Sequence, residues 1–133
     1  MVRKQILIIV LLLAAVLAAC APKTASLENT SWKLIKLGDK DVPAGIEINA
    51  SFHAGQITGK SACNSYFASY TQKNSSLELG PAGSTMMACL DDGVMQWEID
   101  YLTALGNIKS FKLAGSQLDL LDANNKVIMS FGK

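Results

Sequence analysis

Short segments of alternating apolar and polar side chains follow one another along most of this 133-residue chain. In the clearest of them, residues 46–52, the side chains of Ile46, Ile48, Ala50 and Phe52 would share one face. Because side chains alternate between the two faces of a β-strand, this pattern predicts a strand with one buried face. The same reasoning predicts strands at residues 31–37, 56–60, 66–71, 76–79, 110–113, 118–121 and 127–131.

Turn-forming residues separate these segments. Residues 53–55 and 72–75 each lie between two predicted strands, which indicates two hairpins. Residues 114–116 and 124–126 divide the last three strands, which indicates a three-stranded meander.

One segment has the period of a helix. Asp91 and Asp92 precede it and Gly106 follows it. Acidic residues complement the positive end of a helix dipole, and glycine is common just past a helix end. The pattern predicts an amphipathic helix over residues 94–105, whose apolar stripe is Val94, Trp97, Tyr101, Leu102 and Leu105.

About eight short strands and one late helix predict a mostly β protein of the α+β class. We expect one domain, built as a curved antiparallel sheet or cracked β-barrel with the helix packed against it. The aromatic residues favour the core over a binding platform; they are Trp32, Tyr66, Phe67, Tyr70 and Trp97.

The first twenty residues have the pattern of an export signal. Arg3 and Lys4 form a basic start, and residues 6–16 are all apolar. This run is shorter than the roughly 20 residues that a membrane-spanning helix needs. Residues 17–20, Leu-Ala-Ala-Cys, resemble the bacterial lipobox, whose cysteine becomes the lipidated first residue of the mature protein. An uncleaved anchor and an ordinary signal peptide are the alternatives.

These features predict three parts: a signal peptide at 1–19, a lipidated tether at 20–26 and a folded domain at 27–133. Loss of Arg3 and Lys4 would leave 10 basic and 11 acidic residues, a net charge of −1, which argues against a nucleic-acid partner. Ala21 follows Cys20, and by resemblance to Gram-negative sorting signals the absence of aspartate there favours the outer membrane. We therefore expect a bacterial envelope protein that faces the periplasm and contacts the membrane through lipid on Cys20.

If Cys20 carries lipid, Cys63 and Cys89 remain as a pair. In an oxidising compartment such a pair predicts a disulfide. Two buried thiols are the first alternative, and a metal site or a cysteine nucleophile is the second.

The sequence contains few candidates for catalysis. His53 is the single histidine, and we expect it to face solvent in a turn. Asp91 and Asp92 are better explained as helix caps than as paired catalytic carboxylates. Paired zinc-ligand spacings, phosphate loops and nucleophile elbows do not occur. We expect no catalytic residues, no metal and no cofactor; an enzyme built on Cys63 or Cys89 with His53 is the minor alternative.

Two segments together resemble the META-domain (HslJ-like) family. Residues 59–70 are similar to its Gly-Cys-Asn-x-x-x-Gly-x-Tyr stretch, and residues 80–89 to its Thr-x-Met-Ala-Cys stretch. Ala62 and Ala68 depart from the pattern, because the family usually has glycine there. Trp32, the acidic helix that ends near a Leu-Gly pair, and the late Leu-x-Leu at 118–120 also fit.

The resemblance implies a curved sheet or cracked barrel with a packed helix, and no established catalytic residues. It also implies an envelope lipoprotein associated with heat or drug stress, as many members are, while some members in parasites are linked to virulence. The similarity of this fold to secretin-assembly lipoproteins implies an alternative role, in which an apolar concave face holds an acyl tail or an extended peptide. We expect a non-enzymatic, lipid-anchored protein with a binding or stress-response role and a protein or lipid partner.

Overall fold

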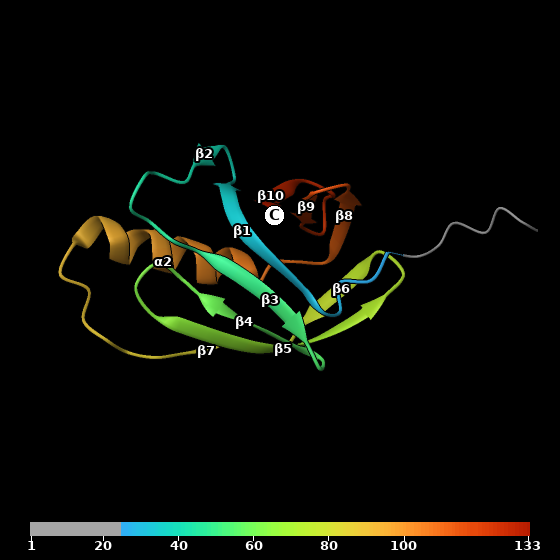
Figure 1. The fold of residues 1–133 in the computed structure, drawn as a ribbon, viewed down its shortest axis with the longest axis horizontal. Coiled ribbons are helices and arrows are strands. Elements are labelled where there is room, and N and C mark those ends of the chain that lie inside the picture. Colours follow the sequence, from blue (N-terminus) through green and yellow to red (C-terminus); the bar gives the residue numbers. More distant parts are fainter. Residues whose placement is uncertain (1–24) are drawn as a thin grey trace, which may run out of the picture.

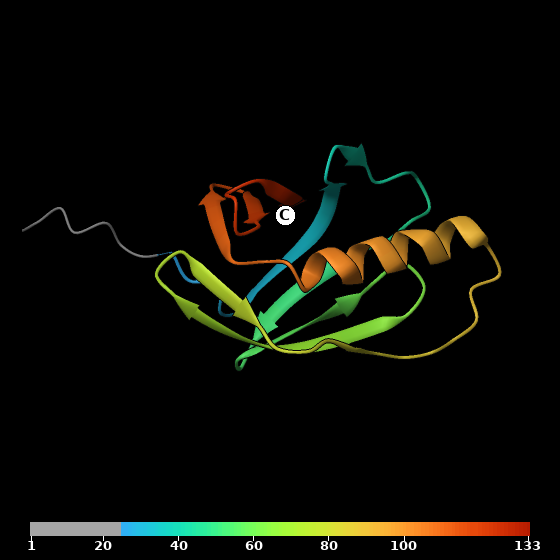
Figure 2. The same ribbon diagram turned by 180° about the vertical axis from the view of Figure 1, so that it is seen from behind.

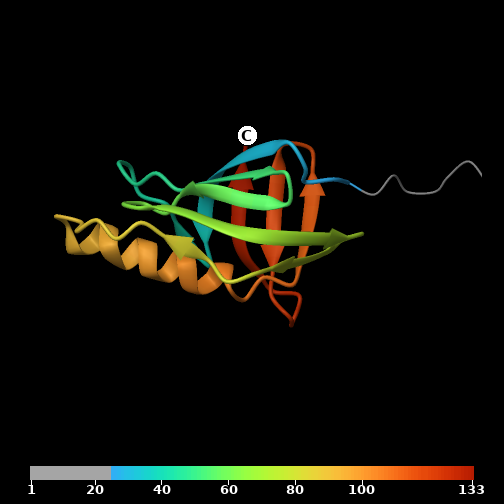
Figure 3. The same cartoon turned by 90° about the horizontal axis from the view of Figure 1, so that it is seen from below.

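The strands close into a barrel (Figures 1 and 3). The structure is a computed structural model and describes residues 25–133, so the predicted signal peptide and Cys20 lie outside it. The barrel order is β10-β9-β8-β6-β5-β4-β3-β1, every pair is antiparallel, and β1 pairs with β10 to close the ring. The eight strands are β1 (Thr30–Leu37), β3 (Asn49–His53), β4 (Gln56–Lys60), β5 (Ser65–Lys73), β6 (Ser76–Leu79), β8 (Ser110–Ala114), β9 (Gln117–Leu121) and β10 (Val127–Gly132).

The prediction of a mostly β protein, a curved antiparallel sheet or cracked barrel of about eight strands with one packed helix, is confirmed in class, and the pairing of β1 with β10 makes the barrel a closed one. The β3–β4 and β5–β6 hairpins and the β8–β9–β10 meander are present. Two short strands were not predicted: β2 (Lys40–Asp41) pairs with β1, and β7 (Gly83–Ser84) pairs with β5. The seam between β6 and β8 is narrow, because only Ser76 and Ser110 are in register there.

One strand begins later than its alternation suggests. The predicted strand at 46–52 is observed as β3, from Asn49, with Ile48 forming an isolated bridge to Ser61. Pro43 and Gly45, the latter at φ +90°, belong to the connection that leads into the strand. The predicted inward face is kept, since Ile48, Ala50 and Phe52 are buried and Ile46 packs partly buried against the core.

Alternation along β5 decides which aromatic residues enter the core. Tyr66, Ala68 and Tyr70 point inward and are buried, as are Trp32 on β1 and Phe52 on β3. Phe67 has the opposite parity and is 58% exposed, so its predicted core position is wrong. Trp97 is partly buried against the core.

The helix α2 spans Asp92–Leu105 and lies beside the barrel (Figure 2). It begins two residues before the predicted start, because Asp91 is the N-cap and its carboxylate accepts the N–H of Gly93 at 2.7 Å. Tyr101 and Leu105 enter the same core as the barrel side chains. Because one core joins barrel and helix, residues 25–133 form a folding unit.

None of the helices within residues 25–133 is long and apolar enough to cross a membrane.

Candidate functional site

A buried carboxylate on α2 holds the loop that follows β4. Glu98 is 5% exposed. Its Oε2 accepts hydrogen bonds from the N–H of Asn64 at 2.7 Å, the hydroxyl of Ser61 at 3.0 Å and the N–H of Cys63 at 3.2 Å. Its Oε1 accepts a fourth, from Nδ2 of Asn64 at 2.8 Å. Sequence reasoning missed Glu98, because an acidic residue within an amphipathic helix is normally assigned to its solvent face.

These hydrogen bonds decide the charge state of Glu98. Burial raises the pKa of its carboxyl, but the bonds from Asn64, Ser61 and Cys63 outweigh burial and leave the pKa below its ordinary value. The carboxylate is therefore ionised at neutral pH and already accepts four donors. A general base needs a pKa near the working pH and an available lone pair, so Glu98 is suited to holding the loop rather than to moving protons.

Asn64 connects this carboxylate to a third segment, the loop before α2. Its Oδ1 accepts hydrogen bonds from the hydroxyl of Thr85 and from the N–H of Met87, both at 2.8 Å. Its Nδ2 is shared between Glu98 and the carbonyl oxygen of Met87, the latter at 3.3 Å. Asn64 thus joins the loop after β4, the loop before α2 and the helix itself.

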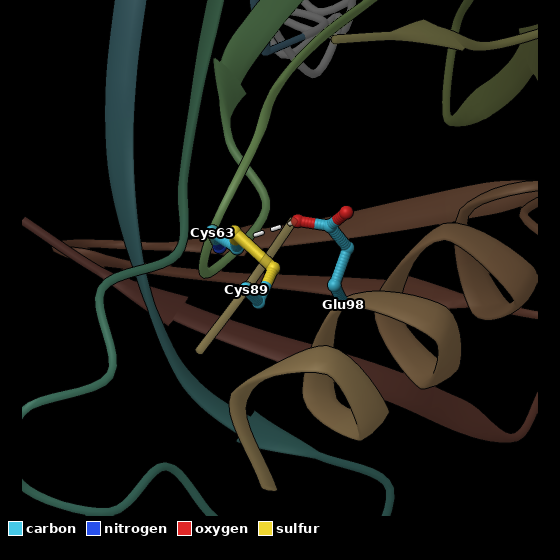
Figure 4. Close-up of side chains that lie close together, drawn as sticks. All are labelled: Cys63, Cys89 and Glu98. Atoms are coloured by element: carbon cyan, nitrogen blue, oxygen red, sulfur yellow. Dashed lines mark hydrogen bonds between the residues drawn. A yellow bond between two sulfur atoms is a disulfide. The ribbon is translucent and has the colours of Figure 1, made fainter. Parts of the chain in front are cut away.

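The two cysteines form the predicted disulfide. Cys63 and Cys89 are bonded with their Cα atoms 6.0 Å apart, and the bridge lies beside Glu98 (Figure 4). The two sulfur atoms and a Glu98 oxygen lie within 4.8 Å of one another, the spacing of a metal site. A metal would need thiolates, whereas these sulfurs are bonded to each other and the carboxylate accepts four hydrogen bonds, so the oxidised cluster does not fit a metal.

His53 lies apart from the cysteines. It ends β3 at the hairpin turn, whereas Cys63 follows the opposite end of β4. Its side chain is 78% exposed, with Nδ1 2.7 Å from Oδ1 of Asn29 and 3.8 Å from Glu28. The prediction of a solvent-facing turn residue is confirmed, and the structure does not assemble a Cys/His pair.

The loop before α2, residues 85–91, is held to the barrel at three alternate residues. Thr85 and Met87 bind Asn64, and Cys89 is bridged to Cys63. The residues between them face outward, and Met86 and Leu90 are almost completely exposed, at 97% and 105%. The side chain of Met87 is also exposed, although its backbone is bound. We call Met86, Met87 and Leu90 the apolar loop surface.

Comparison with known proteins decides the family. The sequence model of the META-domain family matches residues 25–133 of this chain. The chain belongs to the META-domain family. Among curated proteins, none matches it. A protein from Burkholderia xenovorans, solved by NMR, is similar at 30% identity with a TM-score of 0.65, covering 86% of this chain and 92% of that one.

Two further solved structures share the META-domain fold. One is a protein solved by NMR, with 20% identity and a TM-score of 0.61 over 78% of this chain and 88% of that one. The other is the crystal structure of a DUF4847 family protein from Bacteroides vulgatus, with 13% identity and a TM-score of 0.54 over 78% of this chain and 92% of that one.

The structure gives physical meaning to the two alanines that depart from the META-domain pattern. Ala62 adopts φ +94°, a backbone conformation that favours glycine, and it precedes the two N–H groups that bind Glu98. Ala68 lies in β5 and is 1% exposed, so what distinguishes its site is tight packing rather than a left-handed backbone. A third position, Gly83, is covered by the ring of Phe67, since a Cβ there would lie 2.5 Å from Cζ.

A groove runs beside the second half of α2 in this META domain. It has a volume of about 460 Å³ and separates the helix from the segment that joins β6 to β7. Leu79 and Pro81 line one side, and Leu102 and Leu105 line the other. Large side chains fill the core that the barrel shares with the helix, including Tyr66, Tyr101, Phe52 and Phe131. The groove lies between the helix and the β6–β7 segment.

Proposed function

We propose that this META domain is a non-enzymatic, lipid-anchored envelope protein that binds another protein through its apolar loop surface. One observation carries the proposal: the polar side chains and cysteines around Asn64 bind one another, while Met86 and Leu90 project from the loop that they hold. Exposed apolar side chains gathered on one loop are typical of an interaction surface. The association of the family with envelope stress is consistent with such a role.

The lipid anchor would leave this surface accessible. Ala25 lies next to the β5–β6 hairpin, since its carbonyl oxygen accepts a hydrogen bond from Nε2 of Gln72 at 2.6 Å. Five residues of chain reach at most about 18 Å, so a lipid on Cys20 would keep the hairpin end near the membrane. The loop before α2 meets the opposite end of β5, roughly 26 Å away for a strand of this length. Figures 1 and 3 show this loop and the start of the described chain at opposite ends.

The anchor is tested by mass spectrometry of the mature full-length protein made in a Gram-negative host. We expect an N-terminus at Cys20 with diacylglyceryl and N-acyl groups, and recovery in the outer-membrane fraction. The variant C20S should lose both acyl groups and the membrane attachment. A wild-type protein that keeps Met1, or that is cleaved without acylation, contradicts the proposed anchor.

A second function is favoured by the groove beside α2. Its volume of about 460 Å³ falls in the range of ligand sites, and its walls include Leu79, Leu102 and Leu105. This supports a pilotin-like or chaperone-like role in which the groove holds an acyl chain. The variant L102W would fill the groove and should abolish binding of palmitate in native mass spectrometry. Equal palmitate binding by wild type and L102W would exclude the groove as the site.

A further inference from the structure

The apolar loop surface belongs to an acidic part of the chain. Residues 74–108, which include the loop and the whole of α2, contain five acidic residues and no lysine or arginine. All 12 lysine and arginine residues of the chain lie outside this segment. Asp91 is exposed next to Leu90, and Asp100 lies further along the helix, where Lys40 from β2 is 3.7 Å away. Glu98 is buried and Asp100 is paired with Lys40, so the exposed apolar side chains of the surface are accompanied by the exposed carboxylate of Asp91.

We propose that the apolar loop surface binds an amphipathic segment of a partner protein that carries lysine or arginine beside its apolar residues. This rests on the proposed binding function and specifies the chemistry of its partner. Methionine side chains adapt to irregular apolar surfaces, which suits Met86 and Met87 to contact leucine or phenylalanine of the partner. Basic side chains of the partner would complement the exposed carboxylate of Asp91, next to Leu90.

The charge also argues against a membrane as the occupant. Anionic lipid headgroups attract clusters of lysine and arginine, whereas residues 74–108 contain neither and the exposed carboxylate of Asp91 would be repelled. The loop also lies at the opposite end of β5 from Ala25, which argues against contact with the membrane that a lipid on Cys20 would enter.

The loop is also preorganised for binding. Thr85 and Met87 are bound to Asn64, and Cys89 is covalently joined to Cys63, so the backbone is held at three points. A surface that is already ordered loses less conformational entropy when a partner binds. The buried network and the exposed side chains thus act together, because the network fixes the backbone that displays Met86 and Leu90.

The test uses the folding unit, residues 25–133 with the disulfide intact, and two fluorescent amphipathic helical peptides. One peptide is built from leucine and lysine, the other from leucine and glutamate at the same positions. In anisotropy titrations we expect the lysine peptide to bind at least about tenfold more tightly than the glutamate peptide, and its affinity to fall with added salt. Equal affinities for the two peptides would overturn the proposal.

Variants locate the binding surface. The triple variant M86S/M87S/L90S changes exposed side chains, so it should fold as wild type and weaken binding of the lysine peptide by about tenfold or more. The control I35S/V127S removes exposed apolar side chains from β1 and β10 and should bind as wild type. Circular dichroism confirms that each variant is folded. Unchanged peptide binding by the triple variant would overturn the proposal.

The same variants test two other possible binding partners of the apolar loop surface, a lipid membrane and a second copy of this chain. Sedimentation with phosphatidylglycerol vesicles should leave the protein in the supernatant, and analytical ultracentrifugation should show a monomer. Vesicle binding or dimerisation that is lost in M86S/M87S/L90S would assign the surface to lipid or to a second copy and overturn the proposal. If the lysine peptide fails while crosslinking at residue 86 in cells captures a protein, the binding function stands and only the basic chemistry of the partner is wrong.

Discussion

Asn64 and Glu98 are joined by two hydrogen bonds, from the backbone N–H of Asn64 to Oε2 at 2.7 Å and from its Nδ2 to Oε1 at 2.8 Å. The pair links a barrel loop to the helix, and both side chains are buried. The side-chain oxygen of Asn64 accepts hydrogen bonds from Thr85 and Met87, so the same pair also places the loop before α2. The geometry therefore gives these residues a structural role that supports an exposed surface.

The variant E98Q should be markedly less stable than wild type. An amide in place of the carboxylate removes the charge and turns one acceptor into a donor that faces donors, which costs about 2–3 kcal/mol in a buried network. Urea unfolding measures the loss. The control D100N, at a half-buried position of the same helix where Asp100 forms a surface ion pair with Lys40, should change stability by less than about 1 kcal/mol. An E98Q protein as stable as D100N would show that the network contributes nothing to stability.

Acid should destabilise wild type more than E98Q. The folded-state pKa of Glu98 lies below the ordinary value of 4.5, so the unfolded chain takes up its proton first as the pH falls. The stabilisation that the ionised Glu98 contributes is thus present above about pH 4.5 and is lost as the pH falls below it. Urea unfolding at about pH 7 and about pH 3 should show the gap between the two proteins narrowing in acid. Glu28, whose pKa is also lowered, adds the same acid destabilisation to wild type and to E98Q, so it does not change the gap between them. A gap that stays constant would contradict the assigned charge state.

Reduction of the disulfide should destabilise the domain without abolishing the fold. The bridge closes a loop with a sequence separation of 26, for which chain entropy gives about 3.5 kcal/mol. The bonds between Asn64, Thr85 and Glu98 remain after reduction, so the native barrel should persist. Unfolding curves of the oxidised protein, the reduced protein and C63S/C89S provide the comparison. Equal stability of all three would contradict a structural role for the bridge.

One type of substitution, alanine to glycine, should have opposite effects at two sites. At Ala62 the backbone φ of +94° is strained for alanine, so A62G should raise the free energy of unfolding by about 1 kcal/mol. At Ala68, which is buried in β5, A68G removes a packed methyl group and gives the unfolded chain more backbone freedom. This variant should lower the free energy of unfolding by about 1 kcal/mol. Thermal or urea unfolding gives both values. The same sign for the two variants would contradict the explanation by backbone conformation.

Periodicity predicted the barrel strands and the helix, because apolar alternation reports directly on a buried face. It misplaced Phe67, since three aromatic residues in residues 66–70 do not reveal which parity faces inward. It could not find Glu98 or the part played by Asn64, because a buried carboxylate is stabilised by backbone N–H groups from a loop more than thirty residues away. The Cys63–Cys89 pair was predictable because two cysteines remain once Cys20 is assigned to lipid. The attachment of alternate residues of the loop before α2 to Asn64 and Cys63 was not, because it depends on contacts between segments that are distant in the sequence.

Photocrosslinking in intact cells tests the central claim most directly, that the loop before α2 is the binding surface. A photoreactive residue replaces Met86 in the full-length, lipid-anchored protein, and a control replaces Lys112, which is exposed on β8. We predict a discrete crosslinked protein adduct at position 86 that disappears when Met87 and Leu90 are changed to serine, and none at position 112. Adducts at neither position, or equal adducts at both, would contradict the account.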